Sequence, residues 1–339
     1  MKKVSLLLGV IVATITTTFA SIPENAIPFI LDSHVYIQGT LTDTIPVSLI
    51  YDTGADRLYL DKDYMQLSAF GKSPLKKGKA RMSGAGNDGA ETVDIIINPL
   101  TLQTGSVRHT ETITPVINLR EILGRHTDGM IGNNALWTKP LIINYTEGYL
   151  LPIDAVTPDM TDGYVRLPAQ FNDNRIDIEC ELRVDSFKIL DELTDIVVSA
   201  SYNTQGALSD RNHLGIIGNE ILCHYDLIID APGKAIYAKR NSNTDRSYQK
   251  SSTIQMGYID RTDICDGWIV NSLYENGISQ AAGFEIGDII LEINNRPVKT
   301  ISWDEQRKGL GLKGETTFRV QKKNGETVDY KLTIDKQII

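Results

Sequence analysis

An internal repeat constrains the fold of this chain more than any other feature of its sequence. The segment 129–136 (GMIGNNAL) is echoed 86 positions later by 215–222 (GIIGNEIL). In the same register, 141–144 (LIIN) matches 227–230 (LIID). A register that is held without a gap over both stretches predicts two related lobes, each ending with the same turn, short helix and strand.

Short β-rich runs, broken by Gly, Asn, Asp and Pro, surround the first copy of the repeat. These runs are 34–37, 47–51, 92–97, 107–117 and 141–145. Their spacing is typical of an all-β barrel or sandwich. Short helical turns are predicted at 118–123 and 134–137.

The N-terminus has the pattern of a secretory signal. Two lysines are followed by an almost wholly apolar run over 4–12 and by small residues that end at Ala20. This pattern predicts a signal peptide over 1–20 that is cleaved after Ala20, and a mature bacterial protein that is periplasmic or secreted. The apolar run is too short for a spanning helix, and no other segment of the sequence is long enough to cross a bilayer.

Composition excludes several classes of partner. With 43 acidic against 34 basic residues, the net charge of −9 argues against nucleic acid and anionic membrane. Cys180, Cys223 and Cys265 are odd in number and match no zinc spacing and no disulfide framework. Buried thiols are favoured, while a bond between the first two remains an alternative. The five histidines lack ligand spacing, so no metal is expected.

Asp52-Thr53-Gly54-Ala55 lies between two apolar runs, 47–51 and 58–60. Here a carboxylate, a hydroxyl and a glycine stand on a predicted turn between strands. The glycine lets the backbone turn closely and leaves its amide free. An Asp that only orders its own turn is the alternative explanation.

Together with 128–132 (DGMIG), this motif resembles the retropepsin-like aspartic peptidases over roughly residues 28–150. Since 75 residues separate Gly54 from Gly129, there is room for a flap, and the glycine-rich stretch with Gly84 and Gly86 is expected there as a substrate-binding segment. The resemblance implies that Asp52 is a general acid/base oriented by Thr53 and Gly54. It also implies a polypeptide substrate and no cofactor.

Such chemistry needs two carboxylates that share one proton. The second lobe keeps the element 216–218 (IIG), but it has no second Asp-Thr/Ser-Gly. Aligned on the small residues 199–201, Val198 stands where the aspartate is needed. Asp185 is another candidate, although Phe187 follows where a glycine is required. The second lobe is therefore predicted to be degenerate.

Three alternatives follow for the site. Two chains pair so that each Asp52 supplies half of it, as in a homodimer. Activity has been lost, and the cleft is kept for binding. Or Asp185 or another acid completes the site in an unrecognised way.

The C-terminal region, 253–339, resembles a PDZ domain and follows a polar linker over 240–252. Its closest matches to bacterial PDZ domains are 277–284, 287–290 and 294–298. Met256, Gly257, Tyr258 and Ile259 match the loop whose amides accept the terminal carboxylate of a peptide. The resemblance implies that the peptide adds as a strand beside this loop.

The sequence thus predicts a mostly β fold with two pepsin/retropepsin-like β-barrel lobes, the second one degenerate, followed by a PDZ domain. The predicted parts are a signal peptide (1–20), a first lobe (21–152), a second lobe (153–239), a linker (240–252) and a PDZ domain (253–339). The expected function is that of an exported aspartic-type peptidase that recognises polypeptide ends. The alternative is an inactive peptide-binding protein that uses the cleft and the PDZ groove.

Overall fold

The computed structural model describes residues 22–68, 70–82, 91–172, 175–182, 186–194, 215–242, 254–308 and 310–334. The predicted signal peptide, most of the linker, Gly84, Gly86, Asp185 and Val198 lie outside these residues. Among the residues described, no helix is long and apolar enough to span a membrane. No disulfide bond joins Cys180, Cys223 and Cys265, which all lie in the described part of the chain, and Cys223 is buried.

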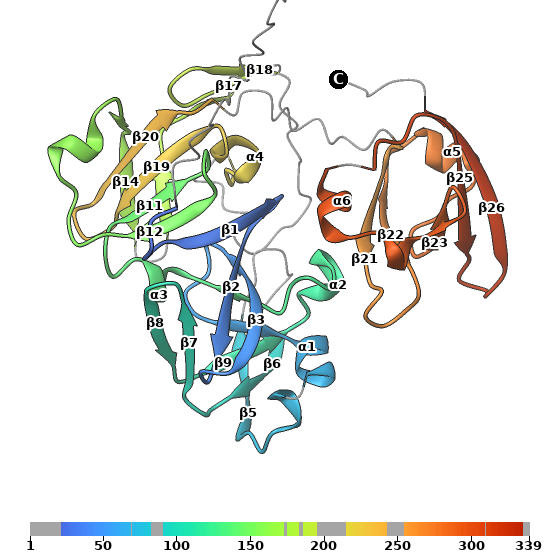
Figure 1. Ribbon diagram of the computed structural model, residues 1–339, viewed down its shortest axis with the longest axis horizontal. Coiled ribbons are helices and arrows are strands. Elements are labelled where there is room, and N and C mark those ends of the chain that lie inside the picture. The colour runs from blue at the N-terminus through green and yellow to red at the C-terminus, as the bar shows by residue number, and fades with distance from the viewer. Residues whose placement is uncertain are drawn as a thin grey trace, which may run out of the picture.

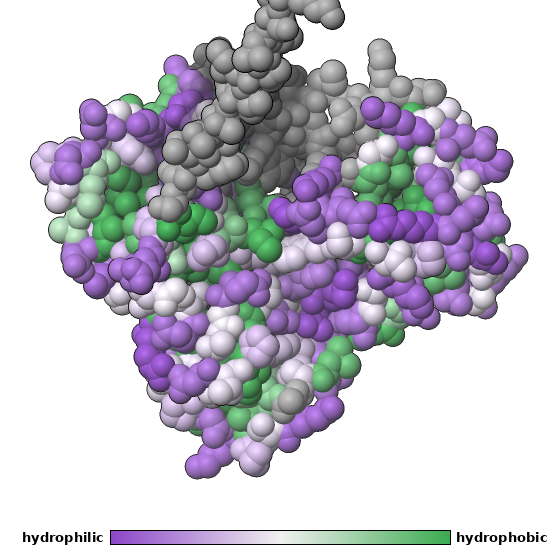
Figure 2. Space-filling model, in the orientation of Figure 1, coloured by the Kyte–Doolittle hydropathy of each residue, from purple (hydrophilic) through white to green (hydrophobic). Residues whose placement is uncertain are grey.

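Strands dominate the fold, as predicted, and the buried side chains form two separate hydrophobic cores. One core takes its residues from 27–238 and the other from 254–334. We therefore distinguish a first lobe (22–152) and a second lobe (153–242), which share one core, from a C-terminal domain (254–334). Figure 1 shows this domain beside the two lobes, and Figure 2 shows that hydrophilic residues cover much of its visible face.

The first lobe contains the predicted strands with small changes of bounds. The run predicted over 107–117 is two strands, because Thr112 and Ile113 interrupt it. The predicted helical turns are α2 and α3. In chain order the elements are β1 (Ile27–Asp32), β2 (His34–Leu41), β3 (Ile45–Tyr51), β4 (Tyr59–Asp61), α1 (Lys62–Leu67), η1 (Phe70–Lys72), β5 (Lys77–Met82), β6 (Glu91–Ile96), β7 (Leu100–Thr104), β8 (Val107–Glu111), β9 (Thr114–Ile117), α2 (Arg120–Leu123), β10 (Gly129–Ile131), α3 (Asn133–Leu136), β11 (Leu141–Asn144) and β12 (Tyr149–Pro152).

The second lobe and the C-terminal domain are built from shorter elements. Those of the second lobe are η2 (Pro158–Thr161), β13 (Val165–Arg166), β14 (Ala169–Asn172), β15 (Arg175–Ile178), β16 (Glu181–Leu182), β17 (Ser186–Lys188), β18 (Glu192–Thr194), α4 (Asn219–Leu222), β19 (Tyr225–Asp230) and β20 (Ala235–Arg240). Those of the domain are β21 (Met256–Asp260), β22 (Trp268–Leu273), α5 (Ile278–Ala282), β23 (Ile289–Ile293), β24 (Arg296–Pro297), η5 (Val298–Thr300), α6 (Trp303–Arg307), β25 (Gly314–Gln321) and β26 (Thr327–Ile334).

A single sheet crosses from one lobe to the other. Its strand order is β13-β20-β19-β11-β12-β1-β2-β3-β10-β4-β9-β6-β5. The lobes meet where β11 pairs with β19, and Ile142 lies opposite Ile228, its own repeat counterpart. The flanking pairs exchange repeat partners in the same way: Leu141 with Ile229, and Ile143 with Leu227. The predicted repeat is therefore a local twofold relation between the lobes.

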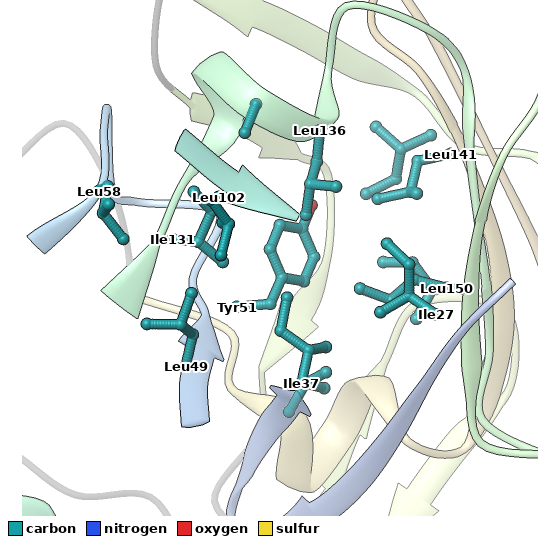
Figure 3. Packing of buried hydrophobic residues seen from close by; sticks show 14 of the residues in the cluster. Ile27, Ile37, Leu49, Tyr51, Leu58, Leu102, Ile131, Leu136, Leu141 and Leu150 are labelled. Atoms are coloured by element: carbon teal, nitrogen blue, oxygen red, sulfur yellow. The ribbon is translucent and has the colours of Figure 1, made fainter. Parts of the chain in front are cut away.

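The shared core surrounds the end of β3. Alternating residues of a strand point to opposite faces, and in β3 the side chains of Leu49 and Tyr51 are buried. Figure 3 shows Tyr51 between Leu49 and Ile131 on one side and Leu141 and Leu150 on the other. The turn that follows Tyr51 therefore starts from a firmly packed strand.

Candidate active site

Asp52 begins the turn after β3, and three hydrogen bonds hold it there. Its main-chain amide donates to the Ile131 carbonyl (3.1 Å), and its carbonyl accepts from the Ala55 amide (3.1 Å). Its Oδ1 accepts from the Gly54 amide (2.7 Å). An Asp side chain that accepts from the amide two residues on orders a turn. Asp52, Thr53 and Gly54 are all exposed, so the turn presents its carboxylate at the surface.

The second predicted element lies directly behind this turn. β10 runs parallel to β3 and antiparallel to β4, so it fills the space between the strands on either side of the turn. Asn133 then donates its main-chain amide to the Ala55 carbonyl (3.0 Å) and its side-chain amide to the Thr53 carbonyl. The structure thus brings together the two motifs on which the resemblance was based.

Gly132 is required for this arrangement. A Cβ atom at this position would lie 1.9 Å from the Ala55 carbonyl oxygen, which is closer than any real contact. Since that oxygen accepts from Asn133, the backbone cannot move away without losing a hydrogen bond that holds the turn. The glycine of the hydrophobic-hydrophobic-Gly element therefore allows the two chain segments to touch.

His34 is a neighbour of Asp52 that sequence reasoning missed. The β2–β3 ladder ends at the pair Val35–Tyr51, which places His34 beside Asp52. Across the β1–β2 hairpin His34 pairs with Asp32. Burial lowers the pKa of His34 below its ordinary value of 6.5, although both carboxylates act in the opposite direction. The signal available in the sequence was the Asp-Ser-His turn at the start of a β-rich run.

The second lobe also reaches this hairpin. Asn219, the repeat counterpart of Asn133, donates its side-chain amide to the Ser33 carbonyl (3.2 Å) and accepts from the Tyr145 hydroxyl (2.7 Å). In the first lobe the equivalent amide holds the Thr53 carbonyl. The Asn of each repeat copy therefore hydrogen-bonds to a different turn: Asn133 to the turn after β3, and Asn219 to the turn between β1 and β2.

The first strands of the two lobes correspond as well. Ile27 of β1 pairs with Leu150. Leu167, which follows β13, donates to the carbonyl of Ile236 (3.0 Å), the repeat counterpart of Leu150. Leu167 therefore takes the place of Ile27, and the correspondence in this part of the lobes is 140 positions.

An offset of 140 positions from Asp52 gives position 192, and Asp191 lies one position before it. The segment 190–195 (LDELTD) has the two Asp residues of 51–56 (YDTGAD) at the same places. A leucine stands where the motif requires glycine, so a search for Asp-Thr/Ser-Gly does not find it. Asp191 is therefore a candidate counterpart of Asp52 by sequence position. It lies in the antiparallel hairpin of β17 and β18, whereas the strands on either side of Asp52 are separated by β10. Val198 lies outside the described residues.

The Asp191 carboxylate contacts two side chains of the second lobe, those of Tyr225 and Arg240. The Tyr225 hydroxyl donates to its Oδ1 (2.8 Å), and Arg240 Nε lies 3.2 Å from its Oδ2. Among the described residues, no contact joins Asp191 to Asp52.

The remaining predicted site residues lie elsewhere. The strands on either side of the glycine-rich stretch, β5 and β6, form an antiparallel hairpin whose last described pair is Met82–Glu91. The segment 256–259, predicted as a peptide-binding loop, is instead part of strand β21. It pairs with β22, with an irregularity between Gly257 and Tyr258. Met256 is buried in the core of the domain, which explains why this segment is a strand.

Comparisons with known proteins identify the C-terminal domain. The PDZ domain family model matches residues 269–307, so this part of the chain is a PDZ domain. No curated protein matches the chain.

Several solved structures are similar at a low level. A retropepsin-like aspartic protease from Rickettsia conorii is 19% identical, with 37% of this chain and 86% of that chain covered and a TM-score of 0.25. EIAV protease in complex with an inhibitor is 20% identical, with 31% of this chain and 86% of that chain covered and a TM-score of 0.21. The HtrA-type protease AlgW with a decapeptide is 12% identical, with 76% of this chain and 80% of that chain covered and a TM-score of 0.21.

Proposed function

We propose that the chain is an exported aspartic-type endopeptidase in which Asp52 activates the attacking water, and whose PDZ domain binds polypeptide ends. The observation that carries this proposal is the turn of Asp52 itself. Its backbone is held by Ile131, Ala55 and Asn133, while its carboxylate is exposed. A catalytic group that is fixed in position loses little freedom when substrate binds.

The chemistry needs a second carboxylate close to the first. Two carboxylates at short range cannot both ionise, so they share one proton. The ionised group takes a proton from water, which attacks the scissile carbonyl carbon. The protonated group donates to the carbonyl oxygen.

The second lobe is the source that we favour for this group. The ladder between β11 and β19 relates the lobes by a local twofold, which supports the proposal that the second lobe takes the role of the partner in a symmetric dimer. Asp191 is the acid of the second lobe that we propose for this role. To act, its carboxylate must exchange the contacts with Tyr225 and Arg240 for one with Asp52.

Peptide mapping by mass spectrometry tests the proposal. An unfolded protein mixture is incubated, from mildly acid to neutral pH, with the mature chain and with Asp52→Asn, Asp191→Asn and Asp43→Asn. Asp43 pairs with Arg108 at the surface, so its variant is a matched control for the change of charge. We expect the first two substitutions to reduce cleavage at least about a thousandfold and the control to have no effect.

Each other outcome has a defined meaning. Loss of cleavage in Asp52→Asn alone, together with a dimeric mass, would assign the second acid to Asp52 of another copy. Equal maps for wild type and Asp52→Asn would refute the peptidase and favour a non-catalytic peptide-binding protein. The N-terminal residue of the exported chain tests cleavage after Ala20.

A further inference from the structure

Strand β21 lies at the edge of the PDZ sheet. The strand order is β21-β22-β23-β25-β26, so within the described part of the chain β21 has a strand neighbour on one side only. The Arg261 amide donates to the Gly267 carbonyl of the strand partner, which by alternation turns the main-chain groups of Asp260 and Tyr258 outward. An edge of this kind is where an extended peptide adds as a strand.

A segment of the first lobe binds the end of this edge at Asp260. The Arg125 amide donates to the outward carbonyl of Asp260 (2.8 Å), and its Nε donates to the carboxylate of the same residue (3.0 Å). Gly124 has a φ of +86°, and a Cβ there would lie 3.2 Å from the Asp260 carbonyl oxygen. The backbone of the docking segment (124–127) therefore lies directly against the edge of β21.

The docking segment also contacts helix α6. The imidazole of His126 stacks on Trp303, with ring centroids 4.4 Å apart and planes inclined by 6°. Gln306, one turn further along the helix, donates to the Asp260 carboxylate (2.9 Å). Figure 1 shows α6 and β21 on the side of the PDZ domain that faces α2. The docking segment thus contacts both this helix and the Asp260 end of the strand edge.

Buried ion pairs join the PDZ domain and the first lobe. Arg261 of the PDZ domain pairs with Asp63 of the first lobe, and Arg120 of the first lobe pairs with Asp263 (3.0 Å). The two arginines are 4% and 8% exposed. Buried charges are costly unless they are paired, and in the docked arrangement each of these charges has a partner across the interface.

We infer that the docking segment is an internal occupant of the β21 edge, so that docking of the PDZ domain on the first lobe and binding of a polypeptide to that edge exclude each other. This inference rests on the peptide-binding part of the proposed function. The ligand is an extended polypeptide, because the exposed groups are those of a strand edge. Its apparent affinity is reduced by the fraction of molecules that are docked.

The docked PDZ domain also forms a hydrogen bond close to Asp52. Trp303 donates Nε1–H to Asp32 (2.7 Å), and Asp32 pairs across its hairpin with His34, the neighbour of Asp52. A polypeptide that takes the edge of β21 frees the Asp32 carboxylate. Occupancy of the PDZ domain and the environment of Asp52 are therefore linked.

Substitutions on the first lobe alone test this inference, since they leave the PDZ domain unchanged. The full chain is compared with a double variant, Asp63→Asn with His126→Ala, and with the control Asp43→Asn. Hydrogen–deuterium exchange over 120–127 and 256–260 measures docking. The binding probe is a pool of synthetic peptides of random sequence with free C-terminal carboxylates.

We expect faster exchange in both segments of the double variant and at least about tenfold tighter peptide binding, with no change in the control. Equal affinities despite faster exchange would overturn the inference, as would unchanged exchange in the double variant. Absence of binding to the opened variant would also overturn it. Cleavage that depends on Asp52, measured separately, would still decide the peptidase proposal.

Discussion

Two glycines at equivalent repeat positions have different surroundings. Gly132 lies against the Ala55 carbonyl, whereas no atom of the described residues lies within 4 Å of a Cβ added at Gly218. Neither has a positive φ. The pair therefore separates the effect of close packing from any intrinsic effect of glycine on the backbone.

We expect Gly132→Ala to destabilise the lobes by about 3 kcal/mol, because the added methyl group overlaps a carbonyl that cannot move freely. Gly218→Ala is the matched control and should change stability by less than about 0.5 kcal/mol. Denaturant unfolding of both variants gives the two values. Equal costs would show that Gly132 does not clamp the Asp52 turn.

His34 should make stability depend on pH. Its pKa is lowered in the folded chain, chiefly by burial, from an ordinary value of 6.5. Below 6.5 the unfolded chain therefore binds the proton more readily, so stability is fully present above this pH and falls as the pH drops toward the folded pKa. His34→Gln should flatten this slope in melting temperatures measured across mildly acid pH.

His224 contributes with the same sign, since burial and Arg240 lower its pKa as well. Part of the slope should thus survive in His34→Gln and disappear when His224→Gln is added. A slope that is unchanged in the single variant would contradict the burial of a neutral imidazole beside Asp52.

At the level of elements, the hairpins on either side of the lobe junction are built alike. Asn144 Oδ1 accepts from the Glu147 amide, and Asp230 Oδ1 accepts from the Gly233 amide, each at 2.8 Å. The pair Asp230–Gly233 lies 86 positions after the pair Asn144–Glu147. The repeat thus preserves turn chemistry as well as strand hydrophobicity.

Leu141 should stabilise both lobes. Its side chain is fully buried in the shared core, and its strand pairs with β19. We expect Leu141→Ala to cost about 2–5 kcal/mol. Hydrogen exchange should speed up in β19 and β20 as well as in β3. An effect confined to the first lobe would mean that the lobes unfold independently.

For the molecule as a whole, the two cores predict two cooperative units. Phe318 is fully buried in the PDZ core and contributes nothing to the other. Phe318→Ala should lower the stability of the PDZ domain by about 3–5 kcal/mol. Calorimetry should then show its transition separated from that of the lobes. One transition that shifts as a whole would indicate that the ion pairs between the units make them unfold together.

Much of the fold was predictable because the relevant signals lie between neighbouring residues. The repeat correctly predicted the turns, short helices and strands that end each lobe. The β-rich runs 47–51 and 141–145 correctly predicted most of β3 and all of β11. A search for Asp-Thr/Ser-Gly does not select Asp191, whose segment has the acid but not the glycine.

The sequence by itself determined the β character of the chain, its repeat, the position of Asp52 and the PDZ domain, since each depends on local periodicity or on a short contiguous motif. Only the tertiary structure decided that His34 lies beside Asp52 and that Arg125 binds Asp260 at the edge of β21. Such contacts join residues that are distant in the chain. They depend on strand register and on the packing of separate cores, which no local pattern specifies.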